Sequence, residues 1–237
     1  MLPYSEGFQL NRFTVILCRP DSPENIGLAA RAMKNTGFSR LRLVMDKPLR
    51  TGAYITAVHS QDILDQAERF SSLSEAVFDL DVIFAAAARP RKNFPSVPLS
   101  GVIPKLKSFS PEFRIGLLFG NERTGLSSQE LRHSNFRIAL PQAADQPSYN
   151  LAAAVLLLLF HLFFHKEEAS GSFDQPKPLS RLKQEECIER ILEKLEEKDF
   201  IHPGNKRHIT SRMYDLFGRL AMSESDCRLL LAAFGSI

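Results

Sequence analysis

Between Phe13 and His165 the chain alternates short apolar runs with segments whose apolar residues recur at helical spacing. A short apolar run bounded by turn residues is typical of a strand that is buried on both faces. Strands that alternate with helices form a mostly parallel sheet with helices on both faces, so we expect an α/β fold. Strands are predicted at Phe13–Cys18, Leu41–Met45, Val82–Ala87, Arg114–Phe119 and Phe136–Leu140.

The first predicted helix has a start signal and a stop signal. Ser22 followed by Pro23 is typical of an N-cap with proline at the first helical position, and Gly37 closes the helix. Further helical patterns lie near Gln61–Gln66, Ser74–Leu80 and Ser100–Lys107.

The composition changes after His165. Residues 166–180 hold two prolines and almost nothing apolar, which is typical of a linker. Helical spacing then returns from Cys187 to Leu195, and two more amphipathic segments follow at Ile209–Leu220 and Ser225–Phe234. We therefore predict a first domain over residues 1–165, a linker over 166–180 and a helical C-terminal extension over 181–237.

Charge and cysteine content limit the class of protein. A net charge of +3 on 237 residues permits an acidic partner without demanding one, so any nucleic-acid contact must be local. The three cysteines are far apart, with neither C-x-x-C spacing nor paired histidines nearby, so we expect no disulfide framework, no structural zinc and no other metal. Residues 1–10 lack the pattern of a secretion signal, and the expected compartment is the cytoplasm.

Leu151–Phe164 is the most apolar stretch. It falls short of the roughly 20 apolar residues that a membrane-spanning helix needs, so no membrane partner is expected. A helix that is apolar all round is buried, here against the sheet on one side and a second subunit on the other.

The loop after Phe119 has the glycine spacing of a phosphate-binding P-loop, from Gly120 to Gly125. Leu126 stands where a P-loop needs its lysine, which disfavours nucleotide hydrolysis. A capping-box pattern begins at Ser127, so the stretch is strand, glycine-hinged loop and helix. Open α/β sheets bind ligands at such a junction.

Together, three blocks indicate a family: Asn25 to Lys34, the Gly120 loop, and Leu140 through Leu151. They resemble the motifs of the SPOUT superfamily of knotted methyltransferases, in its TrmH-like ribose 2′-O-methyltransferase branch. The resemblance implies a trefoil knot, bound S-adenosylmethionine and a homodimer. The tail, with its Ile201-His202-Pro203-Gly204 turn, resembles the extension of the TrmJ type, which methylates the ribose of nucleotide 32 in the tRNA anticodon loop.

Methyl transfer to a ribose hydroxyl requires that the hydroxyl be oriented and its proton eased away. The resemblance assigns activation of the hydroxyl to Arg31, whose guanidinium suits a phosphate or an incipient alkoxide. It assigns orientation to Asn25 and Glu122, and adds Ser148 and Asn150 of the third motif to the catalytic set. From the residues alone, Arg31 is also compatible with an ordinary surface arginine, and Asn150 with a helix cap.

Contacts to the donor fall, by the same resemblance, mainly on backbone atoms. The positions are Ala86, Ala87, Ala88, Gly120, Leu140, Pro147, Ser148 and Tyr149. Two features depart from the family. Residues 86–88 are alanines where relatives often have Thr-Ser-Ala, and Tyr149 stands where leucine is usual. Neither departure is expected to abolish binding of the donor.

Arg89, Arg91 and Lys92 form a basic loop that follows a strand, with Phe94 close by. Such a loop suits RNA phosphates and an unpaired base, although a solvated loop has the same composition. With tRNA as the expected partner, two alternatives stay open. One is 2′-O-methylation of ribosomal RNA or of another tRNA position; the other is a knotted RNA-binding protein without catalysis. Methyl incorporation into RNA distinguishes the last from the enzymes.

Overall fold

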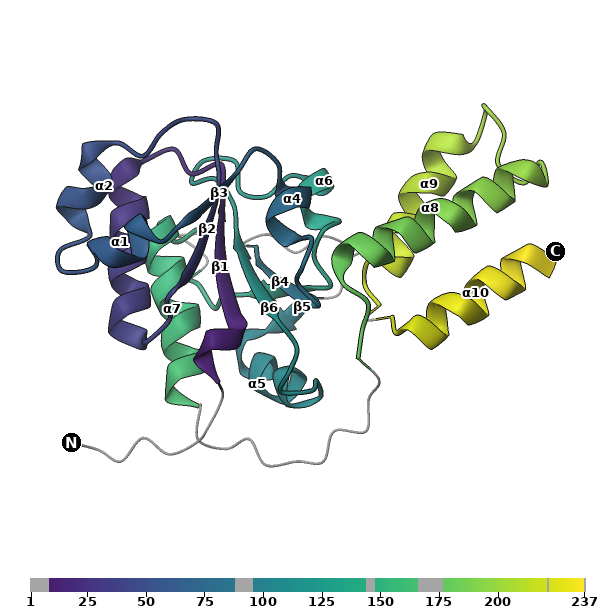
Figure 1. Ribbon diagram of the computed structural model, residues 1–237. Helices are drawn as coiled ribbons and strands as arrows, with labels where there is room; N and C mark the ends of the chain where they lie inside the picture. The colour runs from purple at the N-terminus through teal and green to yellow at the C-terminus, as the bar shows by residue number, and fades with distance from the viewer. Residues whose placement is uncertain (1–8, 88–95, 144–147, 166–176, 221, 237) are drawn as a thin grey trace.

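A seven-stranded sheet forms the centre of the computed structural model, which describes residues 9–87, 96–143, 148–165, 177–220 and 222–236. The strand order is β3-β2-β1-β6-β4-β7-β5, and every pairing between these strands is parallel. The predicted α/β fold is thereby confirmed (Figure 1). The strands are β1 Phe13–Cys18, β2 Arg40–Val44, β3 Glu68–Phe70, β4 Val82–Ala86, β5 Ser96–Pro98, β6 Ile115–Phe119 and β7 Phe136–Ala139.

Helices follow most of the strands. After a short 3₁₀ turn at Leu10–Arg12 they are α1 Pro23–Thr36, α2 Thr51–Thr56, α3 Gln61–Asp65, α4 Leu73–Val77, α5 Leu99–Lys107, α6 Ser128–Leu131, α7 Leu151–Phe164, α8 Arg181–Glu197, α9 Lys206–Phe217 and α10 Glu224–Ser236. Sequence analysis did not predict β3, β5 or α2. The two missed strands have three residues each and lie at the edges of the sheet, where a short polar segment shows no alternation.

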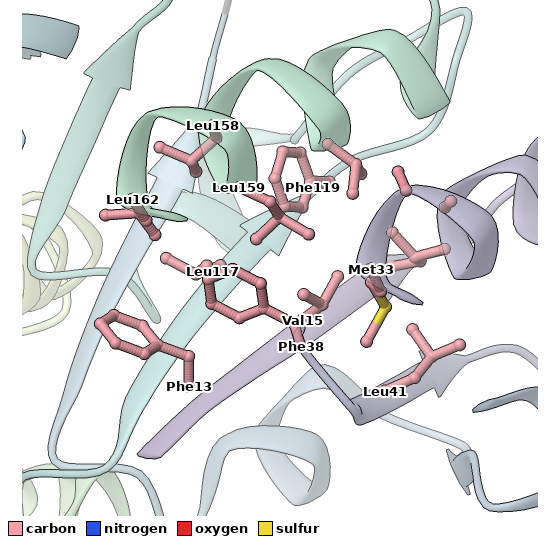
Figure 2. Packing of buried hydrophobic residues seen from close by; sticks show 14 of the residues in the cluster. Phe13, Val15, Met33, Phe38, Leu41, Leu117, Phe119, Leu158, Leu159 and Leu162 are labelled. Carbon is pink, nitrogen blue, oxygen red and sulfur yellow. The ribbon is translucent and has the colours of Figure 1, made fainter. Parts of the chain in front are cut away.

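Successive strand residues point to opposite faces, and each face has its own core. Val15, Leu117 and Phe119 pack with Met33 of α1 and with Leu158, Leu159 and Leu162 of α7 on one face (Figure 2). Ile16, Leu118 and Ala85 pack on the other face beneath α4 and α6. Helices therefore cover both faces of the sheet, as the sequence predicts.

Local signals fix the two helices that matter most to the site. Ser22 caps α1 by accepting a hydrogen bond from the backbone N–H of Asn25 at 3.2 Å, and Gly37 ends it with φ of 78°. Asn150 caps α7 through the backbone N–H groups of Ala152 and Ala153. Among the helices of the described residues, none is long and apolar enough to span a membrane.

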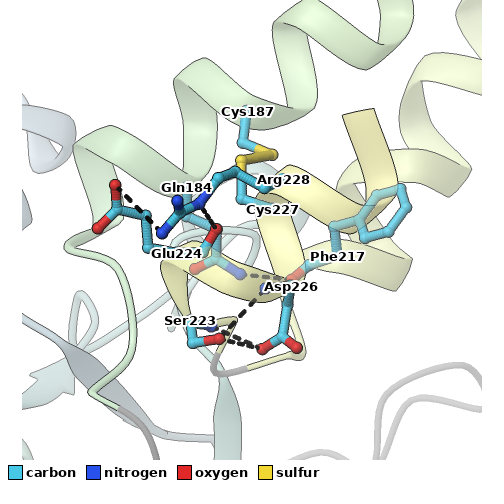
Figure 3. Close-up of a disulfide and its surroundings, with 8 residues drawn as sticks. All are labelled: Gln184, Cys187, Phe217, Ser223, Glu224, Asp226, Cys227 and Arg228. Atoms are coloured by element: carbon cyan, nitrogen blue, oxygen red, sulfur yellow. Dashed lines mark hydrogen bonds and ion pairs between the residues drawn. A yellow bond between two sulfur atoms is a disulfide. The ribbon is translucent and has the colours of Figure 1, made fainter. Parts of the chain in front are cut away.

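In the C-terminal region α8, α9 and α10 share a small core that includes Ile188, Ile191 and Phe217. A disulfide joins Cys187 of α8 to Cys227 of α10 (Figure 3). The expectation of no disulfide framework missed this bond, because partners 40 residues apart in sequence leave no local spacing to detect. The third, Cys18, is free and buried in the sheet. The proposed division at residues 165 and 181 remains a prediction.

Candidate functional site

A cavity of about 410 Å³ opens at the carboxyl ends of β4, β6 and β7. This is the edge of a parallel sheet at which ligands bind. Its volume falls in the range of small-molecule sites, and its walls combine apolar side chains with loop backbone. The lining residues are Ala86, Ala87, Phe119, Gly120, Asn121, Glu122, Arg123, Thr124, Gly125, Leu126, Leu131, Leu140, Gln142, Ser148, Tyr149, Leu151 and Ala154.

The loop after β6 is organised by the buried side chain of Asn121. Its Oδ1 accepts from the backbone N–H groups of Arg123 and Thr124, and its Nδ2 donates to the carbonyl of Arg19 at 2.8 Å. Gly125 has φ of 64°, in the region that favours glycine. A Cβ on Gly120 would lie 2.5 Å from the carbonyl carbon of Gly125, so both glycines are required by the turn.

Sequence analysis overlooked Asn121, although a short amide that bonds the backbone two residues on is a recognisable turn signal. Leu126 and Leu131, which line the cavity after the second glycine, were likewise not predicted as site residues. The capping box from Ser127 to Glu130 is present as predicted, and it places Leu131 at the end of α6.

Glu130 has a second role at the start of α6. Its carboxylate accepts from Nε and Nη2 of Arg19 at 2.6 and 2.9 Å, and from the thiol of Cys18 at 3.2 Å. Burial acts to raise the pKa of Glu130, but the hydrogen bonds from Arg19, Ser127 and Cys18 outweigh it and lower the pKa to about 2. Burial and the Glu130 charge raise the pKa of the Cys18 thiol to about 12, so this thiol stays neutral.

Glu122 connects the three motifs. Its carboxylate accepts from the backbone N–H groups of Asp21 and Ser22 at 2.7 and 3.2 Å, and from Nδ2 of Asn25 at 2.9 Å. Asn25 in turn accepts at Oδ1 from Nδ2 of Asn150 at 2.8 Å. Burial acts to raise the pKa of Glu122, but these hydrogen bonds outweigh it, so the pKa lies below the usual value. All of these donors are neutral, so the carboxylate keeps its net negative charge beside the cavity.

Seven of the predicted site residues line the cavity: Ala86, Ala87, Gly120, Glu122, Leu140, Ser148 and Tyr149. Asn25 joins them through its hydrogen bond to Glu122, and Asn150 through its hydrogen bond to Asn25. Ala88, Pro147, Arg89, Arg91 and Lys92 lie outside the described residues, and their roles remain predictions.

Arg31 lies on the exposed side of α1 and is not among the described residues that line the cavity. Its assigned role requires that a ligand or another chain extend to it. No group of three or more His, Cys, Asp and Glu side chains able to hold a metal ion occurs in the part of the chain that the structure describes.

Comparison with known proteins places the chain among RNA-modifying enzymes. It is 29% identical over 225 residues to the tRNA (cytidine-2′-O-)-methyltransferase TrmJ of Methanocaldococcus jannaschii, covering 93% of this chain and 97% of that protein. It is 30% identical over 242 residues to the tRNA (cytidine/uridine/adenosine-2′-O-)-methyltransferase TrmJ of Pseudomonas aeruginosa, covering 93% and 91%. Because both matches cover 93% of this chain, they extend into the C-terminal region.

The fold agrees with this similarity. The crystal structure of TrmJ from Z. mobilis ZM4 superposes with a TM-score of 0.80 and 28% identity, covering 94% of this chain and 97% of that one. Residues 12–160 match the model of the SpoU rRNA Methylase family, which spans all three motifs and the whole cavity wall. The resemblance drawn from the motifs is therefore confirmed, and the chain belongs to the SpoU rRNA Methylase family.

Proposed function

We propose that the protein transfers a methyl group from S-adenosylmethionine to a ribose 2′-hydroxyl of tRNA, at nucleotide 32 of the anticodon loop. The observation that carries this proposal is the convergence of three distant motifs on one cavity through Glu122, Asn25 and Asn150. Similarity to tRNA 2′-O-methyltransferases over 93% of the chain supports the choice of tRNA.

The cavity suits the donor. S-adenosylmethionine supplies an electrophilic methyl group on a positively charged sulfonium. The backbone of the Gly120 loop offers polar groups, and Leu126, Leu131 and Leu140 offer apolar surface. The carboxylate of Glu122, whose hydrogen-bond donors among the described residues are neutral, also lines the cavity, which favours a cationic ligand.

The protein's own residues orient the ribose and bind the RNA. The carboxylate of Glu122 fixes the amide of Asn25, and Asn25 fixes Asn150 at the start of α7. These amides orient the ribose. Arg31 binds the neighbouring phosphate and stabilises the developing alkoxide. Arg89, Arg91 and Lys92 are proposed to hold the RNA backbone.

We also infer a homodimer, because one side of α7 is apolar and uncovered. Leu156, Leu157, Phe160 and Phe164 are 43, 38, 55 and 70% exposed, and Leu28 of the adjoining α1 is 40% exposed. An exposed apolar patch on two packed helices marks an interaction site. In a dimer with a two-fold axis, this patch on one subunit packs against the same patch on the other. Arg31 follows Leu28 by three residues on α1, so this arrangement supports a role for Arg31 at the partner's cavity.

The test uses the full-length protein, methyl-labelled S-adenosylmethionine and unmodified tRNA transcripts. Mass spectrometry of nuclease fragments is expected to locate the 2′-O-methyl group at nucleotide 32. The matched control is a tRNA with 2′-deoxyribose at nucleotide 32, which lacks the attacking oxygen and is expected to take up no label.

Other outcomes decide between the alternatives. Label at another nucleotide, or only in ribosomal RNA, supports a different substrate within the same enzyme class. RNA binding without any label, in a preparation that binds the donor, supports the non-catalytic reading and contradicts the proposal. A stable monomer at micromolar concentration in sedimentation equilibrium contradicts the dimer.

A further inference from the structure

Helix α6 is held at both of its ends by arginines from distant parts of the chain. At its start, Arg19 after β1 forms the paired hydrogen bonds to Glu130. At its end, Nη2 of Arg181 donates to the carbonyl of Arg132 at 2.6 Å. Arg181 is the first residue of α8, so the C-terminal region holds the end of α6. A helix of four residues has too few internal hydrogen bonds to fix its own position.

Arg181 is a fully buried cation, 1% exposed, whose hydrogen bonds go to neutral oxygens. Besides the carbonyl of Arg132, it donates through Nη1 to the carbonyl of Gly218 at 3.1 Å and to Oε1 of Gln184 at 2.8 Å. Arg132 and Gly218 follow the ends of α6 and α9, where carbonyl groups carry partial negative charge. Burial lowers the pKa of Arg181 to about 10, so the group is still charged near neutral pH.

Other contacts join the same two regions. Asn135, fully buried, accepts at Oδ1 from the backbone N–H of Ile83 at 2.8 Å and donates from Nδ2 to the carbonyls of Gly218 and Leu220. Nη2 of Arg132 donates to the hydroxyl of Ser211 on α9 at 2.8 Å. Residues 132–135, which connect α6 to β7, are therefore held by hydrogen bonds to the C-terminal region.

This connection is adjacent to the cavity. Leu126 before α6 and Leu131 at its end both line the cavity, and both are buried in the core beneath α6. Packed interiors transmit displacements because they leave little free space. A shift of α6 therefore moves two apolar side chains that line the cavity.

We propose that Arg181 is a positioning residue for the methyl-donor site. By holding the end of α6 it sets Leu126 and Leu131 against the donor, so the C-terminal region contributes to donor affinity without touching the donor. This rests on the proposed function, in that the donor occupies the cavity.

The test compares two buried arginines in the full-length protein. Arg181→Met is expected to weaken binding of S-adenosylmethionine at least five-fold by calorimetry, raise its KM, and leave kcat at saturating donor within about two-fold. The control is Arg42→Met. Arg42 is also buried and bonds Glu68, Asp79 and the carbonyl of Ala76, none of which lines the cavity. It is expected to lower stability while donor affinity stays within two-fold.

A folded Arg181→Met protein with unchanged donor affinity overturns the proposal and leaves Arg181 as a docking contact only. Equal losses of donor affinity in both variants overturn it too, because they show a general effect of instability. If Arg181→Met does not fold, Ser211→Ala removes the milder contact to Arg132, and an affinity loss of about two- to three-fold is expected. No change in that variant then counts against the proposal. If the unaltered protein binds no S-adenosylmethionine, the proposed function itself fails.

Discussion

Glu122 and Glu130 lie eight positions apart on one loop-and-helix segment, yet their carboxylates are held in opposite ways. Glu130 pairs with a guanidinium, so its charge is neutralised within the fold. Among the described residues, the donors to Glu122 are amide and backbone N–H groups, which stabilise its charge without cancelling it. Both pKa values lie below the usual range. The difference indicates that a depressed carboxylate pKa alone does not identify a functional group. The two carboxylates differ in their partners: Glu130 pairs with a cation, and the described donors to Glu122 are neutral.

The largest expected effect is on methyl transfer, and it concerns Arg31 of the proposed catalytic set. Arg31→Ala is expected to reduce methyl transfer by about 10²-fold or more while donor affinity stays nearly unchanged, because in the proposed mechanism the guanidinium acts on the ribose and phosphate. Arg31→Lys is expected to restore little, since an ammonium lacks the planar fork. Single-turnover assays with saturating tRNA check this. Near-normal turnover in Arg31→Ala would show that Arg31 is an ordinary surface arginine.

Glu122→Gln keeps the shape of the side chain and removes its charge. The amide has one accepting oxygen in place of two, so the hydrogen bonds from Asp21, Ser22 and Asn25 cannot all remain. Losing a hydrogen bond to a charged group costs about 1.5–3 kcal/mol, which corresponds to a fall of about 10- to 100-fold in kcat/KM. Thermal unfolding of the same samples serves as the control. A loss of stability with full activity would show that Glu122 has a structural role only.

For Glu130→Gln the main effect is expected on stability. The pKa is lower in the folded chain than in the unfolded chain, so the stabilisation is present above about pH 4.5 and is lost as the pH falls towards about 2. Because Arg19 is 52% exposed, solvent screening reduces the contribution to about 1–2 kcal/mol at neutral pH. Urea unfolding of both proteins at several pH values checks this. The two curves should converge in acid, and a difference independent of pH would rule out the ion pair as its source.

The smallest effect concerns Tyr149, which also lines the cavity. Its hydroxyl donates to the carbonyl of Pro141 at 2.5 Å and ties together the two ends of the segment from β7 to α7. Tyr149→Phe removes one neutral hydrogen bond, worth about 0.5–1.5 kcal/mol, so donor affinity should fall by about two- to ten-fold. Calorimetry with the donor measures the change. An unchanged affinity would show that the side chain, unlike that of Glu122, serves no function at the wall.

Local signals account for what the sequence predicted. Short apolar runs identified β1, β2, β4, β6 and β7, and Ser22, Pro23 and Gly37 bounded α1. Contacts between distant residues carry no such signal. Asn25 meets Asn150 across 125 positions, and Arg181 meets Arg132 through a carbonyl that any residue offers. The motifs could indicate which residues share a site, while the hydrogen bonds that join them required the folded chain.

The strand order also has a consequence for synthesis on the ribosome. β6 lies between β1 and β4 in the sheet, although both precede it in the chain. Once β2 has emerged, the free edge of β1 must wait for residues 115–119, which takes roughly 4–14 s at ~5–20 residues per second. During that interval an apolar strand edge is open to solvent and to other nascent chains. In every round of translation the edge of β1 therefore stays exposed for several seconds, until β6, the strand at the centre of the finished sheet, has been made.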